Sequence, residues 1–262
     1  MPVTYVKAPV FPTQPEPLHH LITKLLNEAD TAPIEGQIIA EYVPNSNLLE
    51  AGPIMARTYK TLSGHHFENV LFIIPGMALE SPRISIPTIS EYVTPLGTIP
   101  INDALRNELC DESDDIFLSD ETLFQASALD IHLAFLQVIL GSFKLVPIII
   151  GKDNFDLGKE LGETLSEVLY NHHSLLVASL EIATATASSL EAFQDAFEHL
   201  DIGRLIRLVH SDSMEIHGMS GIIASLIVAA RQQANCGRIF QLEPPSEHMP
   251  GFFGGAVWKT YG

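Results

Sequence analysis

The chain has 262 residues, of which 46% are hydrophobic and 18% charged, so it can bury a sizeable core and should not be disordered. Its 32 acidic residues outnumber its 14 lysines and arginines, which gives a net charge of −18. That charge repels nucleic acid and anionic membranes and argues against both as partners. The two cysteines, Cys110 and Cys236, lie far apart and predict neither a zinc site nor a disulfide framework.

The N-terminal segment contains several prolines, and we expect residues 1–17 to form an extended arm. This segment has no apolar run of signal-peptide length, and no stretch of the chain is long and apolar enough to cross a membrane. We therefore expect a cytoplasmic, soluble protein.

In the first half of the chain, apolar runs typical of buried strands alternate with stretches of helical spacing. The spacing predicts helices over 17–30 and 52–62 and strands over 38–43 and 69–75. Two short extended segments should follow around the turn 95–97. Asn102 should then cap a helix over 104–109.

The second half repeats this alternation. Helices are predicted over 128–140, 157–171, 189–200 and 220–234, and strands over 144–151, 174–180, 238–243 and 254–261. The helix over 189–200 should be opened by Ser188 or Ser189, and no linker or internal repeat interrupts the pattern. The sequence thus predicts a single α/β domain, with a mixed or mainly parallel central sheet flanked by helices.

The turn after the first predicted strand reads "VPNSNLLEAGP", residues 43–53. Ligands in open α/β sheets usually bind at the carboxyl ends of strands, where this turn lies. The turn carries Asn45, Ser46 and Asn47, and it has no histidine, cysteine or carboxylate before Glu50. These side chains are weak ligands for a transition metal.

Several strings in a fixed order resemble the Memo family, whose fold is similar to that of class III extradiol ring-cleaving dioxygenases. They are "VPNSNLLEAGPIMARTY", "TPLGTIPIND", "LAFLQ", "LVPIIIG" and "GGAVWKTY", and they span nearly the whole chain. The resemblance implies the same α/β fold. It also implies a pocket whose residues can be carried over position by position.

Most of those family positions hold other residues in this chain. The family histidines fall on Asn45, Met77, Ser127 and Ala183, a family glutamate falls on Asp130, and a family cysteine falls on His217. Only the aspartate is a conservative exchange. The resemblance therefore implies that the fold is kept and that the family's metal chemistry is lost, with no catalytic residue, metal or other cofactor expected.

Three functions remain open at this stage. The first is a non-catalytic protein that acts as a scaffold or binds a protein partner or small ligand. The second is a divergent metal-dependent oxidoreductase or hydrolase that reuses the pocket with Ser127, Asp130 and His217. The third is a subunit that stabilises an intact paralogue in a hetero-oligomer, and a homo-oligomer is also open.

One further segment, "HSDSMEIHGMSG", is dense in polar residues. A structural role, such as capping, is the favoured interpretation of this segment. A metal site formed by His210, Asp212 and His217 is the alternative. The helix that follows begins near Gly218, and its free backbone N–H groups could bind an anion. We also interpret His132, on the helix over 128–140, as a hydrogen-bonded structural histidine.

Overall fold

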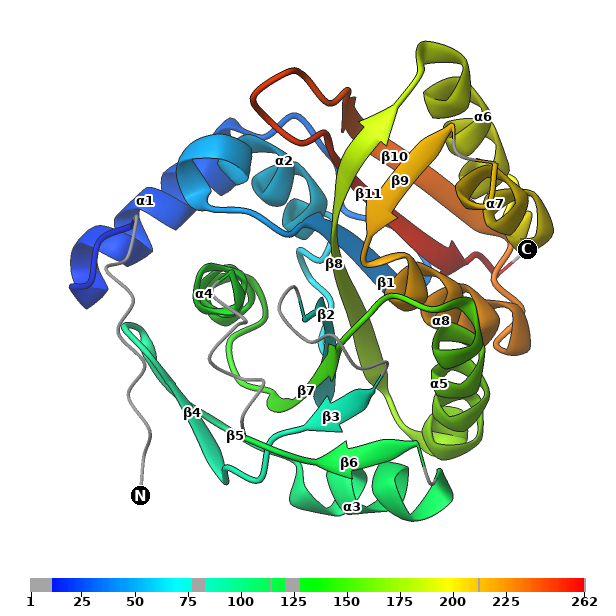
Figure 1. Cartoon of the computed structure of the whole chain (residues 1–262). Coiled ribbons are helices and arrows are strands. Elements are labelled where there is room, and N and C mark those ends of the chain that lie inside the picture. Colours follow the sequence, from blue (N-terminus) through cyan, green and yellow to red (C-terminus); the bar gives the residue numbers. More distant parts are fainter. Residues whose placement is uncertain (1–10, 77–82, 114, 121–127, 212, 262) are drawn as a thin grey trace.

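The computed structural model describes residues 11–76, 83–113, 115–120, 128–211 and 213–261. It has three layers, with helices on both faces of a central sheet (Figure 1). Two of the candidate pocket residues, Met77 and Ser127, lie outside the described residues. The predicted single α/β domain is confirmed.

Nine strands of the described part form one mixed sheet in the order β10-β11-β1-β8-β2-β7-β3-β6, with β9 paired to β8. The central strands β1, β8, β2 and β7 are mutually parallel. The antiparallel pairs are β1 with β11, β11 with β10, β8 with β9 and β7 with β3. Their bounds are β1 Gln37–Pro44, β2 Asn69–Pro75, β3 Ile84–Ile86, β6 Ile116–Leu118, β7 Lys144–Ile150, β8 Ser174–Ala185, β9 Met214–His217, β10 Cys236–Glu243 and β11 Phe252–Lys259. A separate hairpin joins β4 (Glu91–Thr94) to β5 (Gly97–Pro100).

One face of the sheet is covered by α1 (Pro15–Glu28), α2 (Leu48–Lys60) and α4 (Leu129–Leu140), together with the β4–β5 hairpin. The four leucines that α4 was predicted to bury are all at most 7% exposed: Leu129, Leu133, Leu136 and Leu140. Gly141 follows as the C-cap with a positive φ of 75°, a backbone conformation that glycine adopts readily. The four leucines are therefore buried as the spacing predicts, and Ile131, His132, Ala134 and Phe135 on the other sides of the helix are buried as well.

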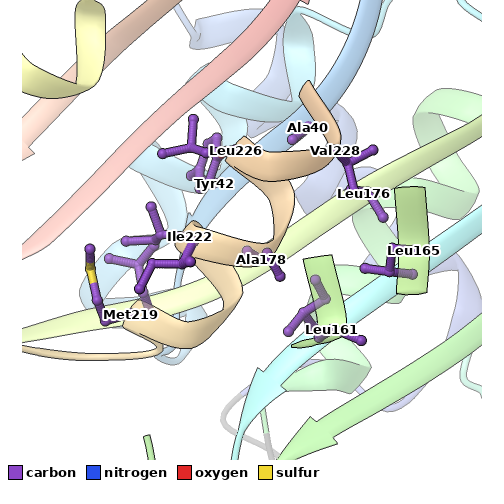
Figure 2. Packing of buried hydrophobic residues seen from close by; sticks show 14 of the residues in the cluster. Ala40, Tyr42, Leu161, Leu165, Leu176, Ala178, Met219, Ile222, Leu226 and Val228 are labelled. Carbon is purple, nitrogen blue, oxygen red and sulfur yellow. The ribbon is translucent and has the colours of Figure 1, made fainter. Parts of the chain in front are cut away.

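The opposite face is covered by α3 (Asp103–Glu112), α5 (Phe155–Val168), α6 (Ala187–Glu198), α7 (Ile202–Val209) and α8 (Met219–Arg231). Figure 2 shows Ile222 and Leu226 of α8 facing Tyr42 of β1, with Leu161 and Leu165 of α5 beside the same helix. α8 thus lies against the sheet, with α5 beside it on the same face. This position fixes the start of α8 against the carboxyl ends of the central strands.

Three sequence predictions differ from the structure. The arm over 1–17 is too long, because α1 begins at Pro15, where a proline in the first turn loses no helical hydrogen bond. The helix α6 is capped by Thr186 rather than by Ser188 or Ser189, and Ser189 returns a hydrogen bond to the cap. The short elements β3, β6, α7 and β9 were not predicted.

The predicted Asn102 cap is confirmed, since its side chain accepts a hydrogen bond from the Leu105 N–H. Within the described residues, no helix is long and apolar enough to cross a membrane.

Candidate functional site

The four parallel strands bring their carboxyl ends to one edge of the sheet. Residues Pro44 of β1 and Leu180 of β8 are paired, as are Pro75 of β2 and Ile150 of β7. The segments that leave this edge therefore lie next to one another, although they are far apart in sequence. This is where ligands bind in open parallel sheets.

The turn after β1 uses its polar groups to start α2. The Asn45 backbone N–H donates to the Leu180 carbonyl over 2.7 Å, which extends the strand pairing by one bond. Ser46 Oγ donates to Glu50 Oε2 over 2.6 Å. The Asn47 side chain accepts hydrogen bonds from two N–H groups of the first turn of α2. Asn47 and Ser46 therefore stabilise the start of α2, whereas the recorded contact of Asn45 is made by its backbone N–H.

His132 lies beneath this turn and is fully buried. Its Nε2 is 3.0 Å from the Pro44 carbonyl, which can only accept, so Nε2 carries the proton. Its Nδ1 then accepts from the Tyr59 hydroxyl over 2.9 Å. Burial lowers the pKa of His132 to about 4, so the ring is neutral at pH 7. Both nitrogens are occupied, which confirms the structural interpretation of this histidine.

Two further candidates lie at this end of the sheet. Asp130, in the first turn of α4, accepts a hydrogen bond of 2.7 Å from the Tyr92 hydroxyl. Burial raises the pKa of its carboxyl group, and the Tyr92 hydrogen bond opposes that shift. Ala183 lies near the end of β8 and is half-buried.

A cavity of about 640 Å³ lies beyond the ends of β2 and β7. It is lined by Pro75, Gly76, Gly151, Lys152, Asp153, Thr184, Val209, Met214, Glu215, Ile216 and His217. Of the candidate residues, this cavity includes His217, and its described lining contains neither Asn45 nor Asp130 nor Ala183. The structure thus does not bring Asp130 and His217 together in this cavity.

His217, at the end of β9, is held between two carboxylates. Its Nδ1–H donates to Glu181 Oε1 over 2.8 Å, and its Nε2 is 3.5 Å from Glu215 Oε1. The hydrogen bond to Glu181 raises the pKa of His217, and partial burial opposes that rise. The two neighbouring carboxylates therefore favour the protonated form of His217.

The beginning of α8 already holds an anion from the chain itself. Asp153 accepts hydrogen bonds from the backbone N–H groups of Gly218 and Ser220, where an external anion was considered from the sequence. Gly218 has a φ of +98°, and a Cβ there would lie 2.5 Å from the Ser179 carbonyl oxygen. Only glycine fits this approach of α8 to β8.

The proposed metal ligands do not gather in the described part of the chain. His210 Nδ1 is 2.8 Å from the Ile206 carbonyl, one helical turn before it, and Asp212 lies outside the described residues. No group of three histidine, cysteine, aspartate or glutamate side chains in the described ranges is placed to hold a metal ion.

Comparison with known proteins agrees with the fold and the order of motifs. The family model for Memo-like proteins matches residues 7–240, which is most of the chain. The chain belongs to the Memo family. Its Memo relatives include MEMO1 family proteins of Thermoplasma acidophilum, 26% identical over 52% of this chain and 51% of the relative, and of Saccharolobus solfataricus, 24% identical over 72% of this chain and 70% of the relative.

A solved structure shares the Memo fold of this chain at much lower sequence similarity. An uncharacterized protein of Escherichia coli K12 superimposes with a TM-score of 0.55, at 12% identity, over 83% of this chain and 99% of that protein. This likeness supports the fold alone.

The described Memo-family positions do not fit a metal. Asn45 offers a neutral amide and Ala183 offers no ligand atom, although the resemblance places histidines at both. The nearest buried imidazole to the Asn45 turn, His132, has both nitrogens engaged. The described donor set is therefore unsuited to iron, zinc or copper.

Sequence reasoning missed Glu181, Lys152 and Asp153 as residues of this edge. The rule that sites follow strand ends could have found Lys152 and Asp153, which come directly after β7. No feature of the sequence predicts the contact between Glu181 and His217. The contact arises in the folded chain, where β9 lies antiparallel to β8.

We expect Asn45→Ala to leave the fold nearly unchanged. The Asn45 contact that the structure records is made by its backbone N–H, which alanine retains, and no core volume is lost. Thermal unfolding should shift by less than about 5 °C, which corresponds to roughly 1–2.5 kcal/mol for a chain of this size. A larger drop would show that the Asn45 side chain is structural.

Proposed function

We propose that this Memo family member is a non-catalytic cytoplasmic binding protein. In this proposal, the cavity at the carboxyl ends of β2 and β7 receives a small ligand or a segment of a protein partner. The family's metal-binding role is absent, and no cofactor is required.

The observation that carries this proposal is the chemistry of the turn after β1. Its polar side chains Ser46 and Asn47 serve the start of α2, and its backbone is bonded to His132 and to β8. A catalytic metal needs several imidazole, thiolate or carboxylate ligands that converge on one point. Asn45 stands where the resemblance puts the first of these ligands.

Metal analysis of the purified full chain tests the proposal directly. We expect less than stoichiometric iron, zinc or copper after purification without chelators, and no change in thermal stability when these ions are added. A ligand that binds the native state but not the unfolded state stabilises a protein, so a bound metal would raise the melting temperature. Stoichiometric metal would overturn the proposal.

We expect a triple variant, Asn45→His, Met77→His and Ser127→His, to gain a metal site. Three neutral imidazoles are sufficient protein ligands for zinc with one open position. The triple variant should therefore bind Zn²⁺ more tightly than the parent, while each single variant gains little. The gain should vanish below about pH 5.5, where free imidazoles with a pKa near ~6.5 are mostly protonated.

Calorimetric titration measures this gain. The three single variants are the matched controls, since each adds one imidazole without completing a site. Equal affinities for the parent and the triple variant would show that the three positions do not converge, and the assignment of family positions would then fail.

A divergent enzyme is the second candidate, and the Glu181–His217 pair favours it. A carboxylate that orients an imidazole at a cavity wall is a common arrangement for general base catalysis. This candidate no longer includes Asp130 in the same cavity, because Asp130 is bonded to Tyr92 and is absent from the lining. Turnover that is lost in His217→Gln would support the enzyme over the binding protein.

The third candidate is a subunit role beside an intact paralogue. Native mass spectrometry of the protein isolated from its source would distinguish this role, since a hetero-oligomer has the mass of both chains.

A further inference from the structure

The central sheet ends on one side in the strand β10 (Figure 1). Among the described strands, β10 has β11 as its single neighbour, so the backbone of its other edge faces away from the sheet. The strand is eight residues long, and apart from Ile239 its side chains are half-buried or exposed. An unpaired strand edge of this kind is a template for pairing with another chain.

The existing hydrogen bonds show which backbone groups of β10 point to the free edge. The Ile239 N–H donates to Glu198 Oε1 at the end of α6 over 3.3 Å, so it points away from β11. On β11, Gly251 exchanges both of its backbone hydrogen bonds with β8, and every second residue after it therefore faces away from β10. Leu242 lies opposite one of these residues, Phe253, so its N–H and carbonyl also point to the free edge.

The bulge in β10 sets Ile239 and Leu242 on the same face of the strand. Phe240 is the extra residue of this bulge. Ile239 and Leu242 both pack against the cluster under α5, α6 and α8, whereas Phe240 packs against the cluster on the opposite face. Since side chains alternate along a strand, Arg238 and Glu243 point to the face of Phe240.

Arg238 and Glu243 have no partner of opposite charge in the described part of the chain. Arg238 is exposed, and its guanidinium group forms no hydrogen bond or ion pair with the described residues. Glu243 is half-buried, and its Oε1 accepts a hydrogen bond of 2.6 Å from the neutral side chain of Gln241. The free edge of β10 therefore carries one unmatched positive and one unmatched negative charge.

These charges match each other when two copies of β10 lie antiparallel around a two-fold axis. With the axis beside the bulge, Arg238 of each copy lies opposite Glu243 of the other, and Ile239 lies opposite Leu242. The same register pairs the two residues whose backbone groups point outward and keeps apolar residues on one face. Opposite charges that face each other stabilise strand pairing, whereas a register that sets Arg238 opposite its own copy would repel.

We propose that the chain forms a two-fold symmetric dimer through antiparallel pairing of its β10 edge with the β10 edge of a second copy, in this register. The Leu242 carbonyl of the second copy replaces Glu198 as the acceptor for the Ile239 N–H. Both copies carry the same extra residue in the bulge, so the pairing stays matched on either side of it. This inference goes beyond the proposed function and does not depend on what the cavity binds.

Analytical ultracentrifugation of the full chain over a concentration series measures the mass in solution. At a salt concentration of about 0.15 M, charges more than about 8 Å apart are largely screened, so the net charge of −18 opposes association only weakly. The parent should shift from the monomer mass of 28.7 kDa toward twice that mass as its concentration rises.

Two charge reversals test the facing pairs. Arg238→Glu and Glu243→Arg each place like charges opposite each other at two symmetric positions of the dimer. Each should weaken self-association at least about tenfold. Lys144→Glu makes the same charge change at an exposed position of β7, and this control should dimerise within about twofold of the parent.

A mixture of the two weakened variants tests the register itself. In a heterodimer of the Arg238→Glu and Glu243→Arg chains, both facing pairs again have opposite charges. The mixture should therefore associate about as tightly as the parent, although neither variant does so alone. A chain that carries both substitutions should likewise regain self-association. The substituted positions are exposed or half-buried, so the variants should fold, and circular dichroism checks this.

A parent that stays monomeric over the whole series would overturn the inference. So would a mixture of the two variants that stays monomeric, or an effect of Lys144→Glu equal to that of Arg238→Glu. These outcomes are separate from the test of the proposed function. Stoichiometric metal overturns the binding-protein proposal and leaves the dimer in place, whereas a metal-free monomer removes only the dimer.

Discussion

We expect Leu133→Ala to lower the free energy of unfolding by about 2–5 kcal/mol, the usual cost of deleting a fully buried leucine side chain. Leu133 is 0% exposed in α4 and belongs to the cluster that α1, α2 and α4 form on one face of the sheet. The truncation removes contacts in the middle of this layer, where the surrounding helices can collapse only partially. Denaturant unfolding followed by circular dichroism measures the change.

The control for this prediction is Leu49→Ala. Leu49 is 78% exposed in the first turn of α2, so the same atoms are removed from solvent contact rather than from a core. Its effect should stay within about 0.5 kcal/mol. If both leucines cost the same, or if Leu133→Ala leaves the midpoint unchanged, α4 does not bury the face described here.

Long elements were predictable from the sequence because their own residues carry enough apolar signal to specify them. In α1 the apolar residues Leu18, Ile22 and Leu26 recur at helical spacing and are buried, and in β7 a continuous apolar run indicates a strand that is buried on both faces. The strands β3 and β6 have only three residues each and exist by pairing with each other and with β7. Such elements carry no periodic pattern of their own.

The candidate site was predictable to a smaller degree. The sequence placed a turn at the carboxyl end of β1, and the motif order indicated the family. The roles of the individual side chains depend on tertiary contacts over long separations, such as Asp153 with the start of α8 and His132 with the Pro44 carbonyl. In the sequence alone, an asparagine-rich turn after a strand is easily interpreted as a ligand site. The structure shows that Asn47 of this turn caps α2.

The strand β1 contains a carboxyl group that is isolated from water. Glu41 is 0% exposed, and its Oε1 accepts a hydrogen bond of 2.6 Å from Thr61 Oγ1. Its Oε2 has no hydrogen-bond partner among the described residues. Burial raises the pKa of Glu41 well above its usual value, and the hydrogen bond from Thr61 opposes that rise only in part. The folded protein therefore favours the neutral acid.

The sign of the pH effect follows from this shift. The unfolded chain releases the Glu41 proton near pH ~4.3, whereas the folded chain retains it to higher pH. Over that interval the folded state binds more protons, so the free energy of unfolding falls as pH rises. The contribution is fully present below the unfolded pKa and is lost as pH rises through the folded pKa.

We expect Glu41→Gln to remove this pH dependence. Glutamine has nearly the same shape, accepts the Thr61 hydrogen bond and carries no charge at any pH. Relative to the parent, the variant should be more stable at pH 9 than at pH 5, by about 1.4 kcal/mol for each pH unit over which the folded chain alone keeps the Glu41 proton. Denaturant unfolding at both pH values measures the difference.

The control is Glu91→Gln, at an exposed position of β4, which should change stability by less than about 0.5 kcal/mol at either pH. A difference between parent and Glu41→Gln that is the same at pH 5 and pH 9 would show that Glu41 is ionised in the folded protein as it is in the unfolded chain, and burial would then not control its ionisation.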